Sequence, residues 1–231
     1  MGKANKFFDG MNKLDPVAAN KALTDNNYSK DAALKLAADI METLRPHIEK
    51  NKDMLKNWRA TDYEERKEFV RTVLDMLLQK YPSNTVKPKI YFKEDTEKAL
   101  ANAPVLKGAA ACFFEKDFVP YAEQAREILG SDEPFFAFFH DLSDPGMVSQ
   151  LVHEFTHYLQ ATHQSTIPQE VGKLASKYYK LPAENRDIYR DSIFEVEAGE
   201  TGNYVRQQMR QILYGRWLEQ AALKQMQNQN D

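Results

Sequence analysis

The chain has little cysteine, no long apolar run and no excess of charge of either sign. Cys112 is the single cysteine among 231 residues, which excludes a disulfide framework and any zinc module built from several cysteines. No run approaches the roughly 18 apolar residues of a transmembrane helix, so the sequence predicts no membrane span. Basic and acidic residues nearly balance, at 31 and 34, which argues against a nucleic-acid surface that neutralises phosphates.

The first residues lack the features of an exported protein. Residues 1–6 contain no apolar stretch of the kind found in a secretory signal, so a cytoplasmic location is expected. The sequence indicates neither an oligomeric state nor whether export without a cleaved signal occurs. Histidine is also scarce, and a histidine-based site must draw on five residues: His47, His140, His153, His157 and His163.

The spacing of apolar residues changes along the chain. Helices are expected at 29–46, 61–81, 121–129, 144–163 and 182–226, and strands at 89–92, 109–114 and 135–140. Pro46 is predicted to end or kink the first helix, and Thr61 and Asp144 are predicted as N-caps. This order predicts an α+β fold, with a helical N-terminal region (1–82) whose first 28 residues form a loose arm, and a second domain (83–231).

One segment carries the residue types of a catalytic metal site. His153, Glu154 and His157 lie in the pattern His-Glu-x-x-His within a predicted helix. Residues four apart share one helix face, so both imidazoles can reach one Zn²⁺. Glu154 lies beside them, where it can accept a proton from a zinc-activated water. The alternative is a polar cluster of core histidines.

A catalytic zinc needs a third protein ligand, and three glutamates in one predicted helix compete for that role. They are Glu195, Glu197 and Glu200. Glu197 and Glu200 share a face and could serve one site, whereas Glu195 points nearly opposite to Glu197, because two residues turn a helix by about 200°. Each glutamate alone is better explained as part of a solvated helix face.

The combined pattern resembles a known class of enzymes. The His153–His157 motif, which His157-x-x-Gln160 closes, and the Glu195-x-Glu197-Ala198 segment resemble the zincin metallopeptidases of the gluzincin type, in particular small bacterial and phage-borne zincins. The resemblance covers about residues 85–215. It implies a zincin-like domain with a short mixed or antiparallel sheet and an active-site helix. It also implies His153, His157 and Glu197 as ligands of Zn²⁺ and Glu154 as the general base.

Further residues are candidates for supporting roles. The oxyanion formed during hydrolysis needs a donor, and Tyr204, on the Glu197 face, is chosen over Tyr189 and His163. Thr201 or Glu200 could orient a ligand imidazole.

A segment rich in small residues precedes the motif. In zincins an edge strand binds extended substrate, and residues 107–112 could have this role, or could form a plain buried strand. Cys112 within that segment is expected to be a small buried side chain rather than a thiolate that caps zinc.

The sequence therefore predicts zinc-dependent hydrolysis of a peptide bond in a protein or peptide substrate that nothing in the chain names. Two alternatives stay open. One is a non-catalytic interaction protein that keeps the zincin fold. The other is a regulated protease whose N-terminal helices cover the cleft until a partner removes them.

Overall fold

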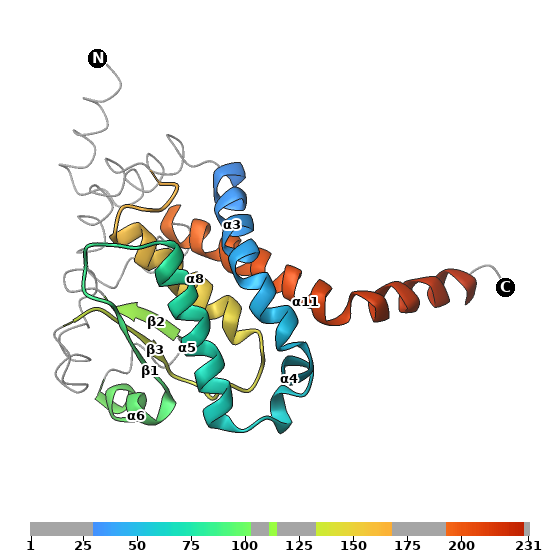
Figure 1. Ribbon diagram of the computed structural model, residues 1–231, viewed down its shortest axis with the longest axis horizontal. Helices are drawn as coiled ribbons and strands as arrows, with labels where there is room; N and C mark the ends of the chain where they lie inside the picture. The colour runs from blue at the N-terminus through green and yellow to red at the C-terminus, as the bar shows by residue number, and fades with distance from the viewer. Residues whose placement is uncertain (1–29, 103–110, 115–132, 168–192, 229–231) are drawn as a thin grey trace, which may run out of the picture.

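The computed structural model describes residues 30–102, 111–114, 133–167 and 193–228. Four helices pack against one another, with a small sheet beside α8 (Figure 1). The elements in chain order are α3 (Lys30–Lys50), α4 (Lys52–Lys56), the 3₁₀ helix η1 (Trp58–Ala60), α5 (Tyr63–Lys80), β1 (Lys89–Tyr91), α6 (Lys93–Asn102), β2 (Ala111–Phe114), β3 (Phe135–Phe138), α8 (Met147–Ala161) and α11 (Ile193–Asn228). The predicted α+β class is confirmed.

The sheet is mixed, which is one of the two forms that the resemblance to zincins implied. Its strand order is β1-β3-β2, with β1 parallel and β2 antiparallel to β3. All four residues of β3 are buried, which explains why the central strand has a continuous apolar sequence rather than an alternating one. Strand β2 is an edge of the described sheet and lies against α8.

Several helix ends differ from the predictions. Helix α3 continues past Pro46 to Lys50. Helix α5 is capped by Asp62, whose carboxylate accepts a hydrogen bond from the Glu64 amide at 2.8 Å, so the predicted cap Thr61 was wrong by one residue. Helix α8 begins at Met147 because residues 144–146 form a tighter turn, in which Asp144 accepts a hydrogen bond from the Gly146 amide at 2.5 Å.

Some predictions lie outside the described residues, including the N-terminal arm, the 121–129 helix and most of the 164–190 segment. Two short helices, α4 and α6, were not predicted. Among the described helices, none has the length and apolar character needed to cross a membrane.

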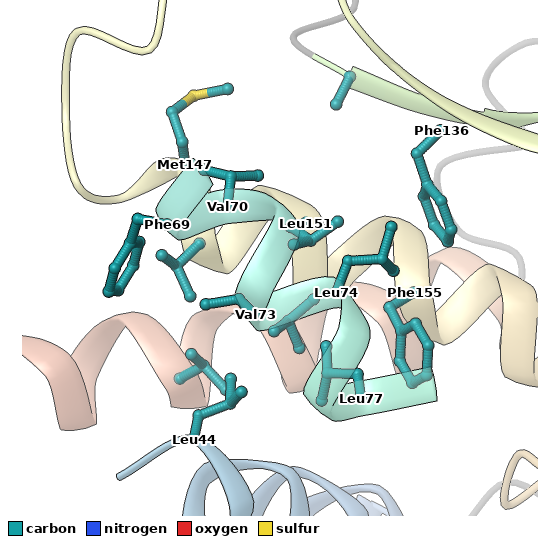
Figure 2. Packing of buried hydrophobic residues seen from close by; sticks show 14 of the residues in the cluster. Leu44, Phe69, Val70, Val73, Leu74, Leu77, Phe136, Met147, Leu151 and Phe155 are labelled. Atoms are coloured by element: carbon teal, nitrogen blue, oxygen red, sulfur yellow. The ribbon is translucent and has the colours of Figure 1, made fainter. Parts of the chain in front are cut away.

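One hydrophobic core joins the helices on both sides of residue 82. Leu44 of α3, Val73 of α5 and Leu151 of α8 belong to the same buried cluster, and Figure 2 shows the α5 side chains packed among these neighbouring helices. The indole of Trp58 and the guanidinium of Arg66 each donate a 2.6 Å hydrogen bond to the Leu142 carbonyl oxygen. These bonds fix the loop that leads into α8. The proposed domain boundary at 82/83 stays a prediction.

Helices α8 and α11 run antiparallel and approach closely at one glycine. Gln160 of α8 bonds to the Phe194 carbonyl near the start of α11, while Ser149 of α8 bonds to Arg206 further along. A Cβ built on Gly202 lies 2.9 Å from the Ser149 carbonyl oxygen and 3.3 Å from the His153 Cβ. Gly202 therefore permits the approach that places α11 against the His-containing helix.

Two glycine substitutions in α11 should have opposite effects on stability. Gly202→Ala inserts a methyl group against backbone, and such overpacking costs about 1–3 kcal/mol. A Cβ on Gly199 meets no atom within 4 Å, so Gly199→Ala should gain up to about 1 kcal/mol of helix propensity. Urea denaturation measures both free energies of unfolding. Equal values for the two variants would contradict the close approach at Gly202.

Candidate metal centre

Helix α8 presents both histidines of the motif on the side that faces α11. The opposite side of α8 is anchored in the core by buried apolar residues, among them Leu151 and Phe155. His153 and His157 are half-buried, and their Nε2 atoms lie 3.3 Å apart. The i,i+4 spacing thus brings the two nitrogens to one point, as the sequence predicted.

The carboxylate at that point belongs to Glu195. One of its oxygens lies 3.3 Å from the Nε2 of His157, and the other lies 3.5 Å from the Nε2 of His153. Together the three side chains form a group whose ligand atoms all lie within 4.8 Å of one another. Zinc bound tetrahedrally at about 2.0–2.1 Å from each ligand atom separates those atoms by about 3.4 Å. The spacing and the donor set therefore fit zinc.

The predicted placement of Glu197 beside the histidines is wrong. Its side chain is fully buried on another side of α11, where one oxygen accepts a 2.9 Å hydrogen bond from the Gln160 amide. The other oxygen accepts hydrogen bonds from the backbone amide of Thr166, at 2.9 Å, and from its hydroxyl. The stated geometry of the helix was right, since Glu195 and Glu197 do point apart. The prediction was that the face of α11 carrying Glu197 meets the histidines of α8, whereas the face carrying Glu195 does so.

Gln160 connects Glu197 to the histidine pair. Its amide nitrogen donates to the Phe194 carbonyl oxygen and to Glu197, so its Oε1 faces Nδ1 of His157 at 2.7 Å. Because that oxygen only accepts, His157 must donate from Nδ1, and its Nε2 faces the centre. Gln160 closes the His-containing motif in the sequence, and its i,i+3 spacing from His157 was the available signal for this role.

The bond from His157 to Gln160 should tune metal affinity. Gln160→Met keeps the side-chain volume but removes the acceptor, and losing such a partner typically lowers metal affinity about 10- to 100-fold. Competition with a chromophoric zinc chelator measures the change. Gln164→Met is the control, because Gln164 bonds to Thr162 rather than to a histidine. Unchanged affinity in Gln160→Met would show that this bond does not orient His157.

Glu154 lies between the histidine pair and strand β2. Its Oε1 is 4.0 Å from the Nε2 of His153, and its Oε2 accepts a 2.8 Å hydrogen bond from the Phe113 amide. The side chain is buried, and this burial raises the pKa of Glu154, with a smaller contribution from Glu195 in the same direction. The carboxylate is thus held at the centre by an edge-strand amide, in the position predicted for a general base.

The charges of the Glu195 carboxylate and of the neighbouring imidazoles shift one another's pKa values. Burial opposes the charged form of His157, but the Glu195 carboxylate outweighs it and raises the pKa of His157 to about 9. Burial likewise opposes ionisation of Glu195, but the two histidines outweigh it and hold its pKa well below the usual value. Glu195 is therefore ionised at neutral pH, as a carboxylate ligand must be, whereas His157 must lose a proton when a metal binds.

Tyr204 lies nine residues beyond Glu195 on α11, and its role as oxyanion donor stays a prediction. This separation corresponds to about half a turn around the axis and about 13 Å along it. The half-buried ring of Tyr204 packs against the hydrophobic core. Of the alternatives, His163 is exposed just after α8, and Tyr189 lies outside the described residues.

Two of the other secondary candidates, Thr201 and Cys112, have ordinary structural roles. The Thr201 hydroxyl donates to the Glu197 carbonyl oxygen within the helix at 2.8 Å, so it does not orient an imidazole. Burial, followed by the charges of Glu154 and Glu195, raises the pKa of the Cys112 thiol, which disfavours a thiolate there. Of residues 107–112, the last two belong to edge strand β2, and binding of extended substrate by this strand stays a prediction.

Comparison of the chain with protein-family models, with curated proteins and with solved structures gives no match.

Proposed function

We propose that the chain is a zinc-dependent peptidase of the zincin kind, which hydrolyses a peptide bond in a protein or peptide substrate. The proposal rests on one observation, the convergence of His153, His157 and Glu195 at separations of 3.3–3.5 Å. The 3.3 Å between the two Nε2 atoms is close to the roughly 3.4 Å between ligand atoms of a tetrahedral zinc site, and each oxygen of Glu195 faces one of the two histidines. The resemblance of the motif to zincins supports the same reading, with Glu195 in place of Glu197 as the third ligand.

The residues around the centre have complementary tasks in this proposal. His153, His157 and Glu195 would hold the ion, which supplies the Lewis acidity that activates water and polarises a carbonyl group. Glu154 would take a proton at Oε1, the oxygen nearer to the histidines, and pass it to the leaving amine nitrogen. A purely structural zinc site has four protein ligands and no need of such a base. The cytoplasmic location stays a prediction.

The proposal is tested by metal analysis and digestion of a peptide library. We expect one zinc per chain and new peptide ends detected by mass spectrometry. A strong chelator should abolish cleavage, and added zinc should restore it. His153→Ala should lose both zinc and cleavage, while His140→Ala, at an exposed histidine, should keep both. Zinc binding without cleavage of any peptide would contradict the enzymatic reading and favour a non-catalytic interaction protein.

A further inference from the structure

A cavity of about 410 Å³ is lined by the start of α8 and by residues 206–214 of α11, and its lining does not include His153, His157 or Glu195. Apolar side chains of Met147, Met209 and Leu213 line part of it. Polar groups line the rest, namely Gln150, Arg206 and Arg210, together with Asp144 and Tyr214. The cavity thus combines an apolar wall with two guanidinium groups one helical turn apart.

The cavity and the metal centre lie along the same pair of helix faces. On α8, Gln150 is one turn before His153 and shares its face. On α11, successive turns from Glu195 pass through Gly199 and Gly202 and then reach Arg206. The glycines contribute no side chains, and the space beside Gly199 is open. Gly202 packs against Ser149 and His153, so a ligand that reaches from the centre to the arginines must pass on the open side of α11, beside Gly199.

The separation corresponds to a short stretch of peptide. Arg206 bonds to Ser149, which lies one turn, or about 6 Å, before His153. Side chains on a helix lean toward its N-terminus, and α11 begins at the metal centre, so Arg206 leans toward that centre. An extended peptide advances about 3.3 Å per residue. Arg206 thus lies about two peptide residues from His153 along the helix axis, and Arg210 lies one helical turn, or about 6 Å, further along α11.

The two guanidinium groups are not neutralised within the described part of the chain. Arg206 donates from Nε to the Ser149 hydroxyl at 3.2 Å, and neither arginine forms an ion pair there. Asp144, the one carboxylate lining the cavity, accepts a hydrogen bond from the Gly146 amide. Two guanidiniums beside an apolar wall suit a carboxylate, which arginine binds through paired hydrogen bonds. The Asp144 charge disfavours a more highly charged phosphate group.

We propose that Arg206 and Arg210 form a subsite for a peptide carboxylate within about four residues of the bond that is cleaved. This inference rests on the proposed function for its role in catalysis. The carboxylate belongs either to an Asp or Glu side chain or to the C-terminus of the peptide. The first source makes the enzyme selective for acidic sequences, and the second makes it a carboxypeptidase.

The subsite can be tested without zinc or activity. N-acetylglutamate is titrated into the ¹⁵N-labelled protein, and the arginine Nε–H signals are followed by NMR. We expect the signals of Arg206 and Arg210, assigned through Arg206→Gln and Arg210→Gln, to shift with a common saturation curve. Arg59 lines a neighbouring cavity and should not shift. If the signals of Arg206 and Arg210 do not shift, the subsite is wrong even in a protein that cleaves peptides.

Cleavage preference then distinguishes the two sources of the carboxylate. Peptide pairs that differ by Glu against Gln near the cleaved bond, or by a C-terminal acid against an amide, are compared by kcat/KM. We expect about a tenfold or greater preference for the charged member of one kind of pair, since hydrogen bonds to charged groups are strong. Arg210→Gln should lose that preference, and Arg59→Gln should keep it. Cleavage with no preference in either pair would overturn the subsite alone, whereas shifted NMR signals without any cleavage would overturn the proposed function alone.

Discussion

Replacing Glu195 with alanine is expected to remove zinc from the protein. Glu195 is the only carboxylate that joins the two histidines in the metal-binding group found among the described residues. Without it, two imidazoles remain, which is fewer than the three protein ligands of a catalytic zinc. The loss of affinity should exceed the 10- to 100-fold typical of losing an outer hydrogen-bond partner. Equilibrium dialysis against buffered zinc measures it.

Glu197→Gln is the matched comparison, two residues along the same helix. Glu197 contacts Gln160 and Thr166 rather than the centre, so this variant should retain zinc, with at most the smaller loss of an outer partner. Circular dichroism checks that both variants fold. If Glu197→Gln loses zinc while Glu195→Ala keeps it, the assignment of the third ligand is reversed.

The second large effect is expected for Glu154→Gln, which should lower kcat about 100- to 10,000-fold, the usual contribution of a general base. Glutamine has nearly the same shape, but its amide cannot take a proton at neutral pH. Zinc content should stay unchanged because Glu154 is not one of the three convergent ligands. Initial rates on the best substrate found in the peptide library measure the effect.

The control for Glu154→Gln is Glu97→Gln, at an exposed glutamate on α6. It removes the same charge far from the histidine motif in the sequence and should leave kcat unchanged. Wild-type activity in Glu154→Gln would exclude Glu154 as the base. A parallel loss of zinc in that variant would instead assign it a role in binding the metal.

Much of the fold could be predicted because its signals are local. The apolar stripe of α5 and the continuous apolar run of β3 depend only on neighbouring residues. Helix starts were predicted less well. The turn at 144–146, for example, depends on a hydrogen bond that the Gly146 amide donates to the Asp144 side chain. Helix α3 continues past Pro46, although this residue was predicted to end or kink it. The predicted helix end at Pro46 is therefore wrong, while the predicted kink stays a prediction.

The candidate site likewise has one part that local sequence signals predict and one part that they do not. The convergence of His153 and His157 follows from helix geometry within one element. The identity of the third residue depends on how α11 packs on α8, and periodicity within α11 alone cannot fix this. The missed signal was Gly202, seven residues after Glu195 on the same side of α11, since a glycine often marks a place where another backbone approaches closely. Gly202 in fact lies against Ser149 and His153.

A crystal structure of the zinc-loaded protein, with anomalous diffraction recorded at the zinc absorption edge, tests the central claim most directly. The account predicts one anomalous peak within bonding distance of the Nε2 atoms of His153 and His157 and a carboxylate oxygen of Glu195. Zinc bound through Glu197, or zinc bound only at other residues, would contradict it.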